Sequence, residues 1–128
     1  MLQSVLQPQE VEVFYIIPAL RSALAKYLKA TGMSQKAIAH LLGLRESTVS
    51  QYIHEHRAHL VHFSKIIEQQ IQQAALRICA PLDTVREIQG LLGAIKTSRE
   101  LCGIHQQINK DIPKHCDTCF IATLEVKA

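Results

Sequence analysis

The chain of 128 residues contains no tryptophan, few aromatic side chains, and only five glycines and four prolines. Ala, Leu, Ile, Gln and Lys dominate instead. Because these residues are mostly good helix formers, the balance favours an all-helical protein. The length suits one compact unit with an extension, which we divide into residues 1–58 and residues 59–128.

Long apolar runs are also absent, and none approaches the roughly 20 residues needed to cross a bilayer. The N-terminus shows no basic start followed by the apolar core of a signal peptide. We therefore expect a soluble, cytoplasmic protein without a membrane partner. The formal net charge of +3 is compatible with a polyanion partner but is too small to establish one. In a reducing compartment, four cysteines favour metal binding or redox chemistry over disulfides.

Apolar spacing of three and four residues predicts a series of helices, with caps and glycines at their ends. The arm before Pro18 is predicted to be extended or a short helix, and the tail from Phe120 to Val126 to be a short strand or docked extension. Gly90 and Gly93 interrupt the last helical pattern. The predicted helices are 18–31 before Gly32, 34–42 with a Ser34 cap, 46–56, 60–78, and 84–102 opening on a capping box of Thr84 and Glu87.

Residues 34–57 match a helix-turn-helix. Such a motif needs a small residue where the second helix crosses the first, a glycine in the tight turn, and a branched apolar anchor in the second helix. Ala39, Gly43 and Val49 stand at those places. The second helix would then protrude and enter a major groove of about 12 Å. The alternative is an αα-hairpin without a DNA role.

If Val49 points inward, helical geometry turns Glu46, Ser47, Ser50 and Gln51 outward as candidate base contacts. Glutamine pairs with adenine, serine with several bases, and a carboxylate with cytosine. Glu46 has an alternative role, which is to stabilise the helix N-terminus. The remaining DNA-binding candidates, read mainly as phosphate contacts, are Gln35, Lys36, Arg45, Thr48 and Arg57.

The first 57 residues resemble predicted bacterial and archaeal regulators with a Cro/repressor-type helix-turn-helix. Arg45 and Glu46 depart from the Thr-Gln often found there, so a capping hydroxyl is missing. The resemblance implies sequence-specific binding to double-stranded DNA. Some of these regulators carry later cysteines that look like iron-sulfur or metal sensors. The matching residues are Ile17-Pro18-Ala19-Leu20-Arg21, Ser34-Gln35, Ile38-Ala39, Leu42-Gly43-Leu44 and Val49-Ser50-Gln51-Tyr52.

The cysteines define a candidate metal site. Cys116-x-x-Cys119 has the spacing of a chelating pair. With Cys102 and Cys79 it gives four thiolates, suited to a [2Fe-2S] or [4Fe-4S] cluster or, alternatively, to zinc. A competing set replaces Cys79 with His105 and has zinc-like pairing.

Helix length bears on this choice. A straight helix from Thr84 to Cys102 would be roughly 27 Å long, leaving Cys79 near the wrong end. Either the helix breaks near Gly90 or Gly93, or Cys79 comes from a dimer mate. A third alternative makes Cys79 a small buried apolar residue.

Two other uses of these residues are less favoured. A thiol-disulfide enzyme usually places Cys-x-x-Cys at a helix start in a βαβ setting, which this sequence lacks. The histidines between His54 and His62 are interpreted as a partly cationic edge beside DNA rather than as metal ligands.

The sequence thus predicts a non-enzymatic, all-α protein: a helix-turn-helix domain, long dimerisation helices and a cysteine-containing C-terminal segment. We expect a homodimeric transcriptional regulator on two half-sites, sensing iron or redox state through an iron-sulfur cluster. The dimer is expected because the apolar stripes of the two long helices would otherwise stay uncovered. The alternative is an antitoxin-like or partner-binding DNA-binding protein with structural zinc.

Overall fold

The computed structural model describes residues 5–54 and 61–121, and over these residues it is helical without a strand. The predicted all-α class is confirmed. Of the short strand or docked extension predicted for Phe120 to Val126, the first two residues belong to a helix, and residues 122–126 lie outside the described residues. The elements are α1 (Pro8–Val11), the π-helical η1 (Glu12–Ile16), α2 (Ile17–Ala30), α3 (Gln35–Leu42), α4 (Glu46–Ile53), α5 (Lys65–Leu76), α6 (Pro81–Thr97), α7 (Glu100–Ile108) and α8 (Thr118–Ile121).

The segment before Pro18 is helical, not extended: α1, η1 and α2 follow one another without a break. Pro18 explains the wide π-turn between them. A proline lacks the N–H that would bond to the carbonyl four residues earlier, here Phe14, and its ring clashes with that carbonyl. A locally widened helix before α2 relieves both problems.

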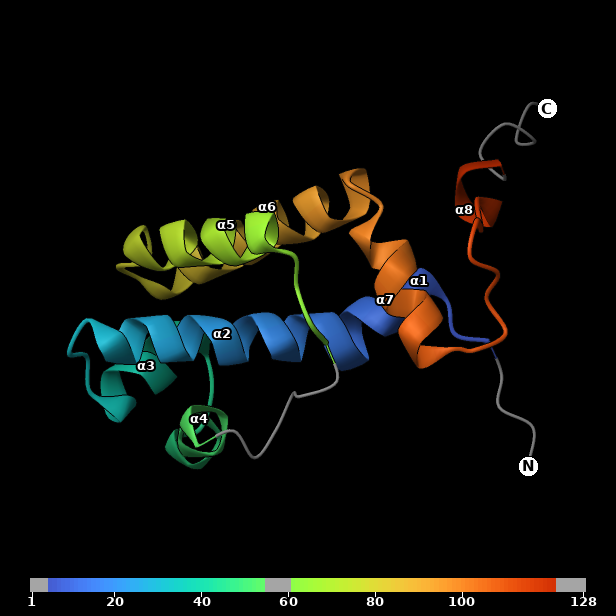
Figure 1. The fold of residues 1–128 in the computed structure, drawn as a ribbon. Helices are drawn as coiled ribbons and strands as arrows, with labels where there is room; N and C mark the ends of the chain where they lie inside the picture. The colour runs from blue at the N-terminus through green and yellow to red at the C-terminus, as the bar shows by residue number, and fades with distance from the viewer. Residues whose placement is uncertain (1–4, 55–60, 122–128) are drawn as a thin grey trace.

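Helix α2 forms the centre of the molecule (Figure 1). It packs against α3 and α4 on one side and α5 on the other, and its buried face includes Leu20, Leu24 and Leu28. One hydrophobic core joins these helices to α6 and α7. The expected division at residue 58 falls within 55–60, outside the described residues, and helices from both sides of it share that core.

Helix α5 packs against α2 and α6 within the chain, and α6 also packs against α3 and α7. Ile67 and Ile71 of α5 and Ile88 and Ile95 of α6 are buried. The premise that these stripes need a second chain to cover them is therefore wrong. Helix α5 also begins later than predicted, at Lys65 after a Ser64 cap whose Oγ accepts the Ile67 N–H at 3.2 Å.

The predicted capping box at Thr84 is wrong. Helix α6 begins three residues earlier at Pro81, where Asp83 Oδ2 accepts the N–H groups of Cys79 and Ala80 at 2.9 Å each. Thr84 is buried one turn further on, and its hydroxyl donates to the Leu41 carbonyl at 2.7 Å. A side chain that looked like a local cap instead ties α6 to α3.

The predicted helix to Cys102 is two helices, and the break is not at a glycine. Gly90 and Gly93 lie inside continuous α6, which ends at Thr97. Arg99 then adopts the left-handed conformation, φ 63°, and α7 leaves at an angle (Figure 1). The Ser64 N–H donates to Glu100 Oε2 at 3.0 Å, which ties the start of α5 to the start of α7.

Candidate nucleic-acid interface and cysteine cavity

A tight turn joins α3 to α4. Ser34 caps α3 as predicted, its Oγ accepting the Ala37 N–H at 3.1 Å. The helix ends at Gly43, φ 67°, a conformation that glycine adopts without strain, and the Leu44 N–H returns to the Ala39 carbonyl at 2.9 Å. We call this unit the α3–α4 pair.

The inner face of the α3–α4 pair matches the predicted scaffold. Ala39 and Val49 are buried, as are Ile38, Leu42 and Tyr52. Arg45 precedes α4 without a side-chain cap, consistent with the missing hydroxyl. The first-turn N–H groups of α4 therefore lack a side-chain acceptor at that position.

The outer face of α4 carries the predicted base-reading candidates. Glu46, Ser47 and Gln51 are exposed. Ser50 is half-buried and less available, because its hydroxyl lies 3.4 Å from His54 Nδ1 while that nitrogen lies 2.7 Å from the Ser50 carbonyl. The prediction that these side chains point outward when Val49 points inward is thus confirmed for three of the four positions.

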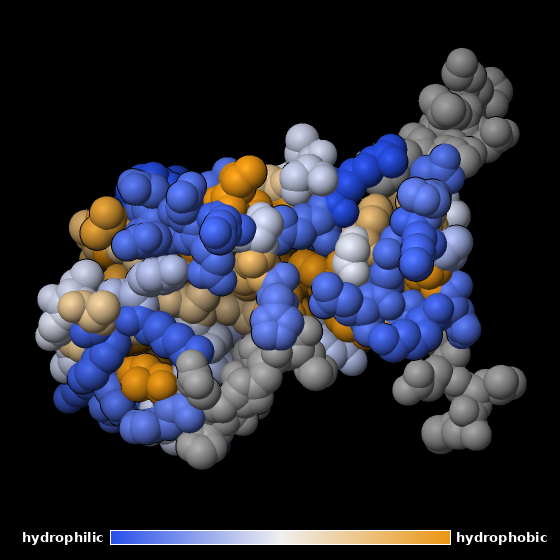
Figure 2. Space-filling view, in the orientation of Figure 1, coloured by the Kyte–Doolittle hydropathy of each residue, from blue (hydrophilic) through white to orange (hydrophobic). Residues whose placement is uncertain are grey.

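The predicted phosphate contacts differ in exposure. Lys36 and Arg45 are exposed, whereas Gln35 and Thr48 are half-buried, and Arg57 lies outside the described residues. The span from α2 to α4 carries five Lys and Arg residues against a single carboxylate, Glu46. The positive charge of the protein is therefore concentrated there. In Figure 2 the surface over α3 and α4 is mostly hydrophilic around a small apolar spot.

The histidine tract gives no ligand cluster within the described residues. His54 is bonded to Ser50 on α4, and His62 is exposed before α5. His56 and His59 lie outside the described residues.

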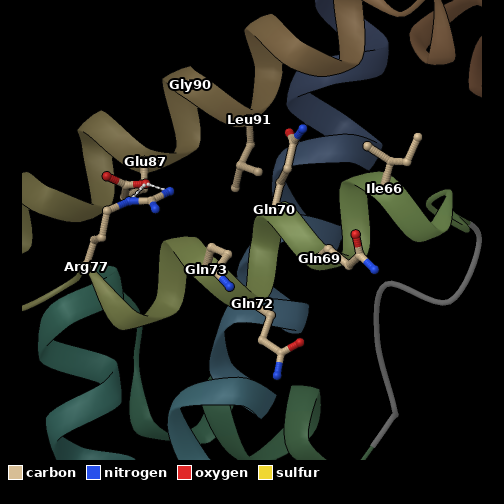
Figure 3. Close-up of a pocket in the computed structure, with 9 residues that line it drawn as sticks. All are labelled: Ile66, Gln69, Gln70, Gln72, Gln73, Arg77, Glu87, Gly90 and Leu91. Atoms are coloured by element: carbon tan, nitrogen blue, oxygen red, sulfur yellow. Dashed lines mark hydrogen bonds and ion pairs between the residues drawn. The ribbon is translucent and has the colours of Figure 1, made fainter.

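A groove of 710 Å³ runs between the outer faces of α5 and α6 (Figure 3). Amide side chains line much of it, and its charged pair is already satisfied. Arg77 Nε donates to Glu87 Oε1 at 3.0 Å, and Arg86 Nε donates to Glu87 Oε2 at 3.0 Å. These bonds hold the pKa of Glu87 below its usual value despite its burial. The groove-lining residues are Ile66, Gln69, Gln70, Gln72, Gln73, Arg77, Glu87, Gly90 and Leu91.

Cys79 lies apart from the other cysteines. It is exposed at the turn between α5 and α6, so the alternative of a buried apolar residue is wrong. The α7–α8 end lies at the other end of α6 (Figure 1). A helix of 17 residues is about 25 Å long. One chain therefore does not bring Cys79 to the other three thiols.

Cys102, Cys116 and Cys119 do gather at one end of the molecule. Burial raises the pKa of the Cys102 thiol, the negative charges of Cys119 and Cys116 raise it further, and Arg99 opposes them. Bonding to Thr118, whose Oγ1 lies 3.5 Å from Cys116 Sγ, lowers the pKa of Cys116. Cys102 and Cys119 also line one cavity, and Cys116 lies three residues before Cys119 in the sequence.

A cavity of 360 Å³ opens beside these thiols, and we call it the cysteine cavity. The N-terminal arm forms one wall, and α6, α7 and α8 supply the rest. The Leu6 N–H donates to Asn109 Oδ1 at 2.9 Å, which holds the arm against the end of α7. The lining residues are Gln7, Pro8, Gln9, Lys96, Leu101, Cys102, His105 and Cys119.

His105 is the feature of this cavity that sequence reasoning left open. Its side chain is buried, and its Nε2 has no hydrogen-bond partner among the described residues. The Cys102-x-x-His105 spacing was the available signal, but spacing cannot reveal an unpartnered nitrogen. Over the described residues, no three His, Cys, Asp or Glu side chains are already arranged to hold a metal ion.

Comparisons with models of protein families, with curated proteins and with solved structures found no match. Within the described part of the chain, every helix is too short or too polar to cross a membrane.

Proposed function

We propose that this chain is a sequence-specific DNA-binding transcriptional regulator that reads its operator with the α3–α4 pair. The observation that carries the proposal is the exposed polar edge of α4, which follows the Gly43 turn while Ala39 of α3 and Val49 of α4 are buried. Helix α4, with eight residues, is about 12 Å long and suits the width of a major groove.

In this arrangement Ser47 and Gln51 lie against base edges, with Glu46 near the start of the helix. Gln51 has the amide geometry that pairs with adenine N6 and N7, and Ser47 donates or accepts. Lys36 and Arg45 contact phosphates on either side, supported by Gln35, Thr48 and Arg57. The five cations between α2 and α4 supply the sequence-independent attraction to DNA.

A homodimer remains part of the proposal because two half-sites about one DNA turn apart match a twofold pair of recognition helices. Its interface is not the buried stripe of α5 or α6. Exposed apolar side chains of the α5–α6 corner, Leu76, Leu82 and Val85, are available for a second chain.

The sensing half of the proposal assigns metal or iron-sulfur binding to the thiols of α7 and α8. A cluster on four cysteines of one chain does not fit, because Cys79 is at the far end of α6. Either a second chain supplies Cys79 or a residue of the cysteine cavity completes the set. A bound metal would fix α7 relative to α1, which continues through η1 into α2 and so to α4. Iron or redox state would then change operator affinity.

A second candidate is a DNA-binding protein with structural zinc, antitoxin-like or partner-binding. His105 favours it, since a neutral imidazole beside thiols is a common zinc ligand. Under this alternative, cysteine variants that remain folded would bind DNA as well as the wild type does.

The test is selection of double-stranded DNA from a random pool by the full chain, followed by affinity titration at several salt concentrations. Gln51→Ala should reduce discrimination at one base pair by about 1–3 kcal/mol. Lys36→Ala should weaken binding to all sequences and lower the salt slope by about 0.9.

Lys65→Ala is the matched control, because Lys65 is an exposed lysine on α5. It should leave both quantities near wild type. If no sequence is enriched, or if Lys36→Ala and Lys65→Ala behave alike, the α3–α4 pair is not the DNA-binding surface.

A further inference from the structure

His105 presents an unexplained buried nitrogen. The residue is 9% exposed, and its buried Nε2 has no hydrogen-bond partner within residues 5–54 and 61–121. Leaving a buried polar atom unsatisfied costs about 1–3 kcal/mol, so such atoms are rare in native proteins and call for a partner. The same side chain lines the cysteine cavity with Cys102 and Cys119.

Four candidate metal ligands, three cysteines and His105, come from two short segments of the chain. Cys102 and His105 are three residues apart on α7 and therefore share a helical face. Cys116 and Cys119 flank the start of α8 with the two-residue spacing of metal knuckles. Gln106 Nε2 donates to the carbonyls of Pro113 and Lys114 at 3.0 Å each, so α7 already holds the connecting segment beside it.

We propose that Cys102, His105, Cys116 and Cys119 of one chain bind Zn²⁺ in a Cys3His site, with His105 Nε2 as the fourth ligand and Cys79 taking no part. This assignment rests on the second candidate, structural zinc, rather than on the iron-sulfur form of the proposed function, and it is independent of the DNA-binding half. Zinc prefers four sulfur or nitrogen ligands in a tetrahedron, at about 2.3 Å for sulfur and about 2.0 Å for nitrogen.

The charge of the cavity suits this ion. Three thiolates around Zn²⁺ leave a net charge of −1, and Lys96 lines the same cavity. Binding releases three thiol protons to solvent, whereas His105 binds as neutral imidazole. Cys116 and Cys119 must draw in toward α7, because no three ligands are yet in place over the described residues. Zinc binding and ordering of the α7–α8 end are therefore coupled.

The test uses the full chain, purified anaerobically, stripped with a chelator and reloaded with Zn²⁺ alone, or with Co²⁺ as a visible probe. We expect wild type and Cys79→Ser to bind about one ion per chain with equal affinity. His105→Ala should lose at least about 100-fold in affinity, because even second-shell losses reach 10–100-fold. His105→Cys should restore binding, with a cobalt spectrum shifted toward four thiolates.

Three results would overturn the assignment: equal zinc affinity in His105→Ala, loss of zinc in Cys79→Ser, or a coloured protein whose iron and sulfide content depends on Cys79. Far-ultraviolet circular dichroism on each variant separates lost ligation from misfolding, and His105→Cys tests ligation in a chain that retains a metal-binding side chain. Measuring DNA affinity on the same samples keeps the two halves distinct. Zinc binding without DNA binding would contradict the proposed regulator but not the zinc site. DNA binding without zinc binding would contradict the zinc site alone.

Discussion

The α3–α4 pair is held by residues close together in the sequence, whereas the cysteine cavity is assembled from the N-terminal arm, α6, α7 and α8. In the pair, the Ser34 cap, the Gly43 turn and the buried residues Ala39 and Val49 fall within 16 residues. In the cavity, Leu6 bonds to Asn109, which is 103 positions away. A locally encoded unit can form its surface early, whereas the cavity exists only once the chain has folded.

The largest expected effect tests whether the α3–α4 pair is a packed unit. Val49→Asp places a carboxylate at a fully buried position. Burying an unpaired charge should cost at least about 4 kcal/mol, enough to unfold a marginally stable domain. Urea denaturation followed by circular dichroism measures the loss.

Ser47→Asp is its control, because Ser47 is exposed two positions earlier on the same helix. It should change stability by no more than about 0.5 kcal/mol while weakening DNA binding through its added negative charge. Similar stability in the two variants would show that α4 is not packed as described.

The second prediction concerns the acid sensitivity of the ion pairs between α6 and the end of α5. Glu87 has a pKa below its usual 4.5, chiefly because of the Arg77 hydrogen bond. A lowered pKa means that the folded state favours the charged form, so this stabilisation is complete above pH 4.5 and is lost as pH falls through the lowered value. Glu87→Gln should cost roughly 2 kcal/mol at neutral pH and flatten the acid limb of the stability curve.

Thermal or urea unfolding between neutral pH and pH 3 checks this prediction. Glu68→Gln is the comparison variant, since Glu68 lies on α5 and accepts the Tyr27 hydroxyl at 3.1 Å. An acid limb that is unchanged in Glu87→Gln would contradict the assignment.

The same contrast explains what the sequence could predict. Ser34 and Gly43 act on neighbours three or four residues away, so the start and end of α3 followed from the residue types. Thr84 looked like a cap because Glu87 follows three residues later, but its hydroxyl reaches Leu41, 43 positions away. Local residue spacing does not predict a hydrogen-bond partner that is so distant in the sequence.

The break after α6 was unpredictable for a related reason. Gly90 and Gly93 have the lowest local cost for a break, yet both remain helical, and the turn falls at Arg99. Ties such as Ser64 to Glu100 across the fold accompany that turn. Likewise, Cys102 and Cys119 line one cavity, in agreement with the chelating pattern, but the unpartnered His105 nitrogen appears only in the folded chain.

The third prediction tests the hydrogen bond that ties α6 to α3 of the α3–α4 pair. Thr84→Val removes the hydroxyl that donates to the Leu41 carbonyl at 2.7 Å, with little change in shape. The buried carbonyl loses its side-chain partner, so stability should fall by about 1–2 kcal/mol. Thr97→Val is the control at an exposed position near the end of α6 and should be nearly neutral. Equal unfolding free energies would mean that α3 and α6 are not tied at Thr84.

The smallest effect distinguishes Gly43 and Gly90, two glycines that differ in backbone conformation. Neither has an atom within 4 Å of an added Cβ, so backbone conformation decides the outcome. Gly43→Ala forces alanine into the left-handed region, φ 67°, and should destabilise by about 1 kcal/mol. Gly90→Ala adds a good helix former inside α6 and should stabilise by roughly 0.5–1 kcal/mol. Melting temperatures of the two variants should therefore move in opposite directions from wild type. A rise in both would mean that the turn in the α3–α4 pair does not need the left-handed conformation.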